Sequence, residues 1–332
     1  MPAFLAWVLL HFAVAVAGTW LAIRYAVWRN LLDQPGARRS HAMATPRGGG
    51  MAIVVAALGG MAWLAASQPE HAWSLAASGL GLLLVAGIGW ADDHAALPAW
   101  PRLLVQALAA ALVAWAIHRT TAVMLDAFLA FGLVMVMVNV WNFMDGIDGL
   151  AASQAAIAAA GLALVLAPGP WAWLGAGLIA AIAGFLPFNF PRARIFLGDV
   201  GSGTLGYLLA VLLLAAYVGQ RSQWPWLLLP VSVFLIDAGF TLAMRILRKE
   251  RWWEPHVQHA YQSWSRRVGS HAPVTMAYAA LSLSAVVLML CAFHWPQSFS
   301  RWICWAWYGV LALAWVRVGS HREIRLNKEA GQ

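Results

Sequence analysis

Apolar segments of about 20 residues recur from one end of this chain to the other, and this feature constrains its fold more than any other. A helix of about 20 residues crosses the roughly 30 Å hydrocarbon core of a bilayer. The 332 residues are 62% hydrophobic and only 10% charged, whereas soluble domains carry about 25% charged residues. We therefore expect an all-α, polytopic integral membrane protein that forms a single transmembrane domain over residues 1–332.

The hydropathy pattern predicts about 11 transmembrane helices. The first of them has no basic start and no clear cleavage site followed by a soluble domain, so we interpret it as a retained helix rather than a signal peptide. The expected spans are 4–23, 49–66, 73–90, 103–118, 123–141, 152–167, 171–188, 202–219, 226–244, 275–295 and 302–317.

The basic residues predict the orientation of these spans. If the connections alternate sides, 18 of the 21 Lys and Arg residues fall on one side. Positive residues favour the cytoplasm, so we expect a periplasmic N-terminus and a cytoplasmic C-terminus that ends in a basic tail, 319–332. The net charge of +8 then reflects topology, and we expect no nucleic-acid partner.

Carboxylates gather on the same predicted cytoplasmic side, although topology rules place little constraint on acids. An acid in hydrocarbon costs about 2–3 kcal/mol unless it is paired, hydrated or bound to a cation. Acids from several connections that meet on one face suggest a site for a divalent metal and phosphate. The acids on this side are Asp33, Asp92, Asp93, Asp145, Asp148, Asp199, Glu250 and Glu254.

The first two cytoplasmic connections carry a basic and an acidic motif. In "RRSHAMATPRGGG", Arg39, His41 and Arg47 precede three glycines that open a helix. Such a helix start attracts anions, but a flexible positive-inside loop explains the residues equally well.

In "ADDHAALP", Asp92 and Asp93 lie at the negative end of a helix dipole, which calls for a compensating cation or for a helix that continues past them. Neighbouring acids can also split their pKa values and leave one as a base.

The third and fourth connections supply further candidate ligands. In "NVWNFMDGIDGLA", the side chains of Asn142, Asp145 and Asp148 are three residues apart and would share one face of a helical turn. In "FNFPRARIFLGDVGSGTLG", Asn189, Arg194 and Asp199 precede a glycine-rich helix start that suits metal and phosphate.

The last cytoplasmic loop, "RKERWWEPHVQHAYQ", contains His256 and His259. Without cysteines nearby a zinc site is not expected, and a diphosphate contact or a pair of solvated histidines stays open. Asp237 lies inside the ninth span, where a carboxylate is a functional or pairing candidate. Arg245 on the same helix, or a neighbouring helix, could supply its partner.

The five motifs, in this order, resemble the polyprenyl-phosphate N-acetylhexosamine-1-phosphate transferases, which are of the glycosyltransferase family 4 type. The resemblance covers about residues 30–320. The spaced histidines of "HVQH" and the arginine-rich first loop favour the branch that primes O-antigen, as in lipopolysaccharide biosynthesis, or another surface polysaccharide. They are unlike the branch that transfers muramoyl-pentapeptide phosphate.

The resemblance implies a membrane transferase that moves N-acetylhexosamine 1-phosphate from a UDP-sugar to undecaprenyl phosphate and releases UMP. It implies Mg²⁺ or Mn²⁺ as cofactor, a bacterial inner-membrane location with the site facing the cytoplasm, and it leaves a homodimer open. The implied catalytic residues are Asp92, Asp93, Asp145 and Asp148. The implied metal ligands are Asp199 and Asp145. The implied substrate contacts are Asn142, Asn189, His256 and His259, and the basic side chains proposed above from their own chemistry as further substrate contacts are Arg39, His41, Arg47 and Arg194.

Two matters stay open from the sequence. The donor could be UDP-GlcNAc, UDP-GalNAc, UDP-FucNAc or UDP-QuiNAc, because these sugars differ at groups that a few loop side chains would recognise. A lipid or nucleotide-sugar transporter is the alternative function. It predicts acids near the middle of a span, and Asp237 is the residue that fits it.

Overall fold

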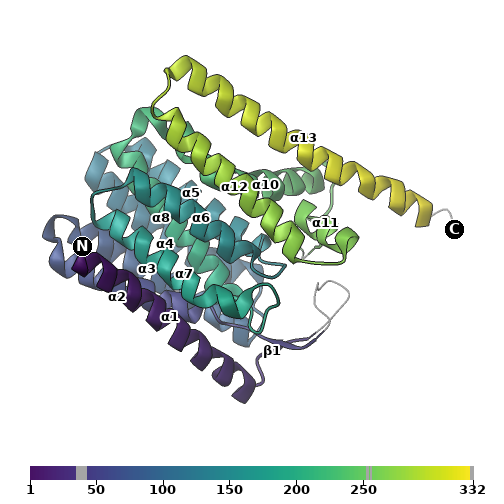
Figure 1. The fold of residues 1–332 in the computed structure, drawn as a ribbon, viewed down its shortest axis with the longest axis horizontal. Coiled ribbons are helices and arrows are strands. Elements are labelled where there is room, and N and C mark those ends of the chain that lie inside the picture. Colours follow the sequence, from purple (N-terminus) through teal and green to yellow (C-terminus); the bar gives the residue numbers. More distant parts are fainter. Residues whose placement is uncertain (35–42, 252–253, 255, 330–332) are drawn as a thin grey trace.

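The chain folds into a bundle of α-helices, most of which run roughly along one direction (Figure 1). This computed structural model describes residues 1–34, 43–251, 254 and 256–329, with side chains as far as residue 318. The α-helices are α1 (Pro2–Trp28), α2 (Met51–Ser67), α3 (Ala72–His94), α4 (Ala99–Thr121), α5 (Met124–Phe143), α6 (Leu150–Val165), α7 (Pro170–Asn189), α8 (Gly198–Gly219), α9 (Trp224–Leu227), α10 (Ser232–Leu247), α11 (Ala260–Val268), α12 (Ala272–Ala292) and α13 (Gln297–Glu329).

Short elements complete the described fold. Three 3₁₀ helices, η1 (Pro69–His71), η2 (Arg221–Gln223) and η3 (Leu229–Val231), lie between the longer helices. Two strands of two residues, β1 (Leu32–Asp33) and β2 (Thr45–Pro46), pair antiparallel in the connection between α1 and α2. The predicted all-α class is therefore confirmed, with this minimal ribbon as its only described sheet.

Eight helical segments in the described part of the chain are long and apolar enough to cross a membrane. Two further apolar helices are shorter, Met51–Ser67 and Leu150–Val165. The protein is thus a multi-pass membrane protein. The eight longer segments are Pro2–Trp28, Pro69–His94, Ala99–Thr121, Met124–Phe143, Pro170–Asn189, Gly198–Gly219, Arg221–Leu247 and Ala272–Ala292.

The predicted count of about 11 spans is too high, since the described residues give eight candidates, or ten with the two shorter helices. The predicted span 302–317 lies within α13, which is helical but does not qualify. Its uncharged stretch is confined between Arg301 and Arg317. At about 1.5 Å per residue such a stretch reaches little more than 20 Å, which is short of the roughly 30 Å hydrocarbon core.

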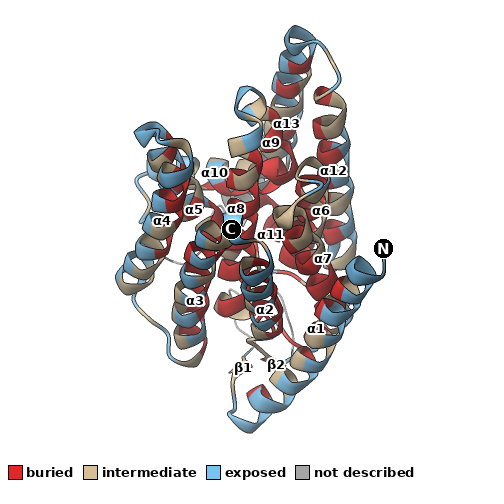
Figure 2. Cartoon of the chain, turned by 90° about the vertical axis from the view of Figure 1, so that its left-hand side faces the viewer, coloured by how far each residue is buried: buried red, intermediate tan, exposed pale blue. Residues whose placement is uncertain are grey.

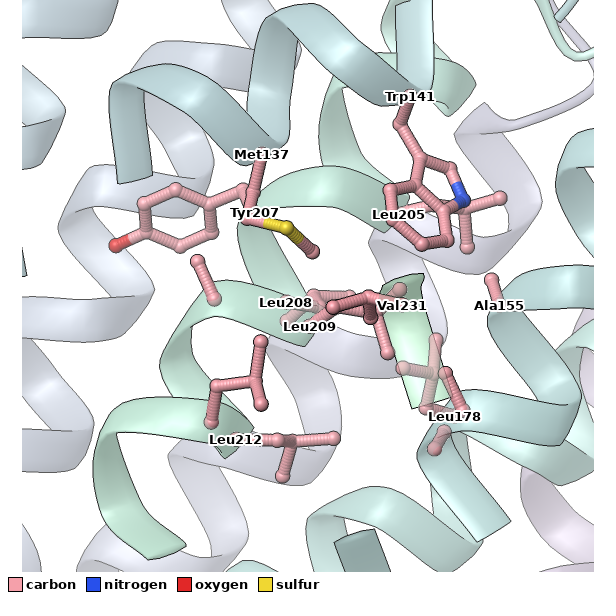
Figure 3. Packing of buried hydrophobic residues seen from close by; sticks show 14 of the residues in the cluster. Met137, Trp141, Ala155, Leu178, Leu205, Tyr207, Leu208, Leu209, Leu212 and Val231 are labelled. Atoms are coloured by element: carbon pink, nitrogen blue, oxygen red, sulfur yellow. The ribbon is translucent and has the colours of Figure 1, made fainter. Parts of the chain in front are cut away.

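Helix α8 forms the centre of the bundle. It packs against α3, α5 and α6, and Figure 2 shows it as a largely buried element surrounded by helices whose outer faces are exposed. Leu205, Tyr207 and Leu209 of α8 meet Met137 and Trp141 of α5 in the close-up of Figure 3. A helix apolar on all sides is expected to be buried, and its burial holds the start of α8 in a defined place.

Close backbone contact sets the position of the α8 start against α2. A Cβ on Gly50 would lie 2.1 Å from the Cα of Gly201, so any larger residue would force the helices apart. The backbone N–H groups of Gly49 and Gly50 donate hydrogen bonds to the carbonyls of Phe196 and Leu197, each at 2.9 Å. Glycine permits this approach because it has no side chain.

The connections that carry the sequence motifs converge at one end of the bundle. In Figure 1 this is the end toward which α1 runs, where β1 and α11 also lie, while the N-terminus lies at the opposite end. Hydrogen bonds join residues of four of these connections, as described below. Orientation of the bundle in a membrane stays a prediction from the basic residues.

Candidate active site

Asp199, in the first turn of α8, lies at the centre of a polar cluster built from four helices. Its carboxylate accepts a hydrogen bond from Nδ2 of Asn142, at the end of α5, at 2.6 Å. Its other oxygen lies 3.6 Å from Nη1 of Arg102 on α4. Its side chain is 34% exposed, so a metal ion or a phosphate can reach it.

Asp92, near the end of α3, joins the same cluster. Its carboxylate accepts hydrogen bonds from Nη1 of Arg102 at 2.7 Å and from the backbone N–H of Leu97 at 2.6 Å. The Asp92 and Asp199 side chains are also within hydrogen-bonding reach of each other. The structure thus brings Asp92, Asp199 and Asn142 together, and Arg102 connects the two acids.

Asp93 has a different environment from its neighbour. Both acids are buried, but the Asp93 carboxylate accepts hydrogen bonds from the backbone N–H groups of Asp199 at 3.0 Å and Val200 at 3.2 Å. The negative charge therefore lies at the positive end of the α8 dipole, which compensates for its place at the negative end of α3. Arg47 donates a hydrogen bond to the Asp93 backbone carbonyl, and its Nε lies 3.9 Å from the carboxylate.

The glycine-rich start of α2 is used for packing, in contrast to one of the two sequence interpretations. Since Gly49 and Gly50 donate their N–H groups to carbonyls of the α7–α8 connection, these two donors are not available to an anion. The start of α8 is likewise occupied by the Asp93 carboxylate. Anion binding in this region would therefore depend on side chains such as Arg47.

Asn142, Asp145 and Asp148 do not share a helical face, because α5 ends at Phe143 and the following residues form a turn. Asn142 faces Asp199. Asp148 instead lies 3.1 Å from Nδ1 of His271, and its backbone carbonyl accepts a hydrogen bond from Thr275 on α12. The motif thus connects the centre of the bundle to the start of α12.

Asp145, between Asn142 and Asp148, has a backbone hydrogen bond to the Asn142 carbonyl but no described hydrogen bond or ion pair from its carboxylate, which lies in the field of other acids. Burial is the main cause that raises the pKa of its carboxyl to about 8, and the charges of Asp93 and Asp148 raise it further. A carboxylate among acids, with no described cationic partner, is an arrangement that a divalent cation would stabilise.

The last loop and the start of α11 contact the end of α5. His259 is buried, and its ring stacks near those of Phe143 and Tyr261. The Tyr261 hydroxyl donates a hydrogen bond to the Phe143 carbonyl at 3.0 Å. The His256 ring lies 4.8 Å from that of His259. Both predicted histidines therefore lie beside the connection that contains Asp145.

Asp237 is the residue that fixes this loop. Its carboxylate accepts hydrogen bonds from the backbone N–H groups of Ala260 and Tyr261, at 2.7 and 3.1 Å, and from the Tyr278 hydroxyl at 2.8 Å. An intramembrane acid usually requires a partner, and here α11 and α12 provide it. Arg245 instead bonds to Glu250 and to carbonyls of the following loop.

The remaining predicted contacts divide into three groups. Asn189 is buried, accepts a hydrogen bond from the Gly149 N–H and donates one to the Ile195 carbonyl, so it holds two connections together. Arg194 is exposed, bonds to the Pro187 carbonyl and stacks on Phe188. Arg39 and His41 lie outside the described residues.

Two residues of the site were missed by the sequence analysis. Arg102 was counted only among the topology-determining basic residues, and His271 was not singled out. Arg102 lies ten residues after Asp92, and His271 lies at the start of a late helix. Each of these positions gives only a weak local signal in the sequence. Only the contacts at 2.7 Å to Asp92 and 3.1 Å to Asp148 identify them.

The oxygen ligands of the cluster suit Mg²⁺ when substrate phosphates supply the remaining ligands. Among the described residues, no group of three or more His, Cys, Asp and Glu side chains is arranged as a metal site. Mg²⁺, however, is usually held by one or two carboxylates together with waters and substrate phosphates. Such carboxylates, with hard oxygen ligands, come from the partly exposed Asp199, from its neighbour Asp92 and from Asp145, which has no cationic partner among the described residues.

Comparison with known proteins identifies the family of this chain. The family profile "Glycosyl transferase family 4" matches residues 73–217, which include Asp92, Asn142, Asp145 and Asp199. The chain belongs to glycosyl transferase family 4. The resemblance inferred from the five motifs is confirmed.

Several relatives refine the position of this family 4 chain. It is 29% identical over 294 residues to a probable undecaprenyl-phosphate N-acetylglucosaminyl 1-phosphate transferase of Bacillus subtilis, covering 80% of this chain and 79% of the relative. It is 32% identical over 273 residues to the decaprenyl-phosphate N-acetylglucosaminephosphotransferase of Mycolicibacterium smegmatis, covering 70% and 66%.

A phospho-N-acetylmuramoyl-pentapeptide-transferase of Thermosynechococcus vestitus is 32% identical over 231 residues, covering 62% of this chain and 60% of the relative. The matches to the N-acetylglucosamine enzymes named above extend over more of the chain. The prediction that the chain is nearer to them than to the muramoyl-pentapeptide branch is confirmed.

Proposed function

We propose that this protein transfers N-acetylglucosamine 1-phosphate from UDP-N-acetylglucosamine to undecaprenyl phosphate or a similar polyprenyl phosphate, with release of UMP. Family membership and the names of the relatives support the reaction class and both substrates. The observation that carries the assignment to this site is the convergence of Asp92, Asn142 and Asp199 at one end of the bundle, around a partly exposed carboxylate.

The chemistry needs two anionic substrates to meet. A divalent cation and guanidinium groups reduce the repulsion between a lipid phosphate and a nucleotide diphosphate. We assign Asp199 and Asp145 as ligands of Mg²⁺, which would supply charge neutralisation on the diphosphate. Arg102 would then contact substrate phosphate oxygens, because its guanidinium already lies against both acids of the cluster.

The two members of the aspartate pair have separate roles in this proposal. Asp92 is buried beside the partly exposed side chains of Asp199 and Arg102, and it would assist the acceptor phosphate. Asp93 would keep the start of α8, and with it Asp199, in place through its hydrogen bonds to backbone N–H groups. Direct attack by the acceptor phosphate is favoured, since positioning alone makes an existing phosphate nucleophile competent.

On the nucleotide side, His256 and His259 would contact the diphosphate or sugar, while Asn142 and Asp148 order the turn beside them. Asn189 supports the same turn through Gly149. The excess of Arg and Lys on the side of these connections supports a site that faces the cytoplasm of a bacterial inner membrane. A nucleotide arriving from the cytoplasm and a lipid arriving from the bilayer could both reach this boundary.

The transporter alternative loses its main support in this structure. Asp237 satisfies its carboxylate with α11 and α12, and so holds a loop of the site. The direct test is a UMP-release assay on purified protein with UDP-N-acetylglucosamine, undecaprenyl phosphate and Mg²⁺. Release that requires both lipid and metal is expected. No release with any UDP-N-acetylhexosamine from folded protein would contradict the proposal.

A further inference from the structure

His271, directly before α12, contacts the turn between α5 and α6, and the assignments above give it no role. Its Nδ1 atom lies 3.1 Å from Oδ2 of Asp148. An unprotonated nitrogen at this distance would place its lone pair against those of the carboxylate, so we assign the proton to Nδ1. His271 therefore donates a hydrogen bond to the Asp148 carboxylate. The Asp148 backbone nitrogen, 3.4 Å from the same atom, is the weaker contact.

The contact between these two side chains is shielded from solvent. His271 is 16% exposed at its side chain and Asp148 is 13% exposed. Hydrogen bonds to an ionised carboxylate are stronger than those between neutral groups, and water competes little for a bond with so little exposure. The bond thus keeps the Asp148 side chain on the α12 side of the turn.

Thr275 holds the backbone of the same aspartate. Its side chain is buried, and its hydroxyl donates a hydrogen bond to the Asp148 carbonyl at 2.8 Å. Residues four apart lie on the same face of a helix, so Thr275 and His271 approach Asp148 from one side. One helix therefore fixes both the side chain and the main chain of Asp148.

The rest of the turn is held by other helices. Asn142, just before it, donates to Asp199 at 2.6 Å, and the N–H of Gly149, at its end, donates to Asn189 at 3.0 Å. Asp145 lies between these anchors, and its carboxylate has no described hydrogen bond or ion pair of its own. The place of this carboxylate therefore depends on the backbone of the turn.

Helix α12 provides a rigid support for the contact. It runs from the end of the bundle where α11 lies to the opposite end, where α13 begins (Figure 1). Further residues on the same face bond to neighbouring helices: the Tyr278 hydroxyl donates to Asp237 at 2.8 Å, and Ser282 bonds to the side chain of Gln154 on α6. A group held by such an element keeps its position better than one held by a loop.

We propose that His271 is a positioning residue that orders the turn between α5 and α6, and with it the Asp145 carboxylate, for a divalent cation. The inference rests on the proposed function, and it adds a residue that acts on the site through Asp148. A ligand that is ordered before the cation arrives binds it more tightly, because no ordering cost opposes binding. Loss of a residue that orients metal ligands typically lowers metal affinity or activity by about 10–100-fold.

Replacement of His271 tests the proposal through cation binding. We expect His271→Ala to raise the Kd for Mn²⁺, measured by electron paramagnetic resonance on purified protein, about tenfold. The Mg²⁺ concentration that gives half-maximal UMP release should rise with it. A loss of folded protein would lower the amount of bound Mn²⁺ and kcat without changing either constant. An Mn²⁺ Kd equal to that of wild type would overturn the proposal.

The matched control is His294→Ala. His294 is exposed and follows the opposite end of α12, so its loss should change neither constant. If His294→Ala weakened Mn²⁺ binding as much as His271→Ala, the effect would not come from the contact with Asp148, and the assigned role would fail.

Two conservative variants locate the effect at Nδ1. The amide nitrogen of Asn is bonded to Cγ, as Nδ1 is in histidine, whereas the amide nitrogen of Gln lies one bond further from the backbone. We expect His271→Asn to bind Mn²⁺ nearly as tightly as wild type and His271→Gln to resemble His271→Ala. Equal Kd values for the Asn and Gln variants would contradict a hydrogen bond from this position.

Hydrogen exchange provides a measurement without metal or turnover. In metal-free protein, the backbone amides of residues 145–149 should exchange faster in His271→Ala than in wild type, because the turn has lost one of its anchors. Exchange in the buried centre of α8, residues 205–212, should stay the same. A turn that exchanges at the wild-type rate in this variant would show that His271 does not order it.

These outcomes separate the two proposals. If wild-type protein releases no UMP but His271→Ala weakens Mn²⁺ binding and loosens the turn, the transferase assignment fails and the positioning role stands. If wild-type protein is an active transferase and His271→Ala matches His294→Ala in Mn²⁺ Kd and in exchange, the function stands and the positioning role fails.

Discussion

The carboxylate of Asp93 accepts hydrogen bonds from the backbone N–H groups of Asp199, at 3.0 Å, and of Val200, at 3.2 Å. The second aspartate of the "DD" pair therefore caps the helix whose first turn carries the assigned metal ligand. Asp92, directly before it in sequence, bonds to Arg102 instead. Two adjacent acids thus serve two different parts of one site.

This division predicts that the two acids differ in their effect on stability. Asp93→Ala leaves two buried N–H groups without their acceptor, which costs about 1–3 kcal/mol for each such loss. We expect a clearly lower thermal midpoint in detergent together with lost activity. Asp92→Asn should lose activity at nearly unchanged midpoint. Equal midpoints for both variants would contradict the capping role of Asp93.

Asp199→Asn should abolish turnover and leave the fold intact. The amide keeps the size of the side chain but removes the charge that binds a divalent cation. UMP release should fall to background at any Mg²⁺ concentration, and Mn²⁺ binding measured by electron paramagnetic resonance should weaken. A fully active variant would remove Asp199 from the metal site.

His259→Ala should reduce kcat/KM by a large factor, on the order of 100-fold or more if the histidine contacts the transferred phosphate. The comparison variant is His294→Ala, a histidine just after α12 at the opposite end of the bundle from the site. Its rate should stay near wild type. A His259→Ala rate near wild type would show that the last loop does not contact the donor.

Asp237 is expected to act through the position of α11. Asp237→Ala removes the acceptor of two backbone N–H groups and of the Tyr278 hydroxyl. We expect a higher KM for the UDP-sugar and faster hydrogen exchange in residues 256–265. Tyr278→Phe removes one of the four described hydrogen bonds to the Asp237 carboxylate, about 1 kcal/mol, and should give a smaller change of the same kind. If both variants leave KM unchanged, Asp237 serves stability alone.

The sequence alone was sufficient to predict an all-α membrane protein, its family and the set of connections that meet at one end of the bundle. Hydropathy predicts the all-α membrane fold, because a backbone in lipid must satisfy its hydrogen bonds within helices. The order and chemistry of five motifs predict the family and the connections. The count of spans was overestimated, because hydropathy marks the apolar stretch between Arg301 and Arg317 without testing whether it is long enough.

Only the tertiary structure decided which atoms of the site meet. Asp93 and Asp199, which share a hydrogen bond, are 106 residues apart in sequence. Asp237 and Ala260 of α11, which also share a hydrogen bond, are 23 residues apart. Arg102 and His271 gain their roles from contacts with other helices. Hydrogen bonds between helices depend on how whole segments pack, and such packing leaves no local pattern in the residues that form them.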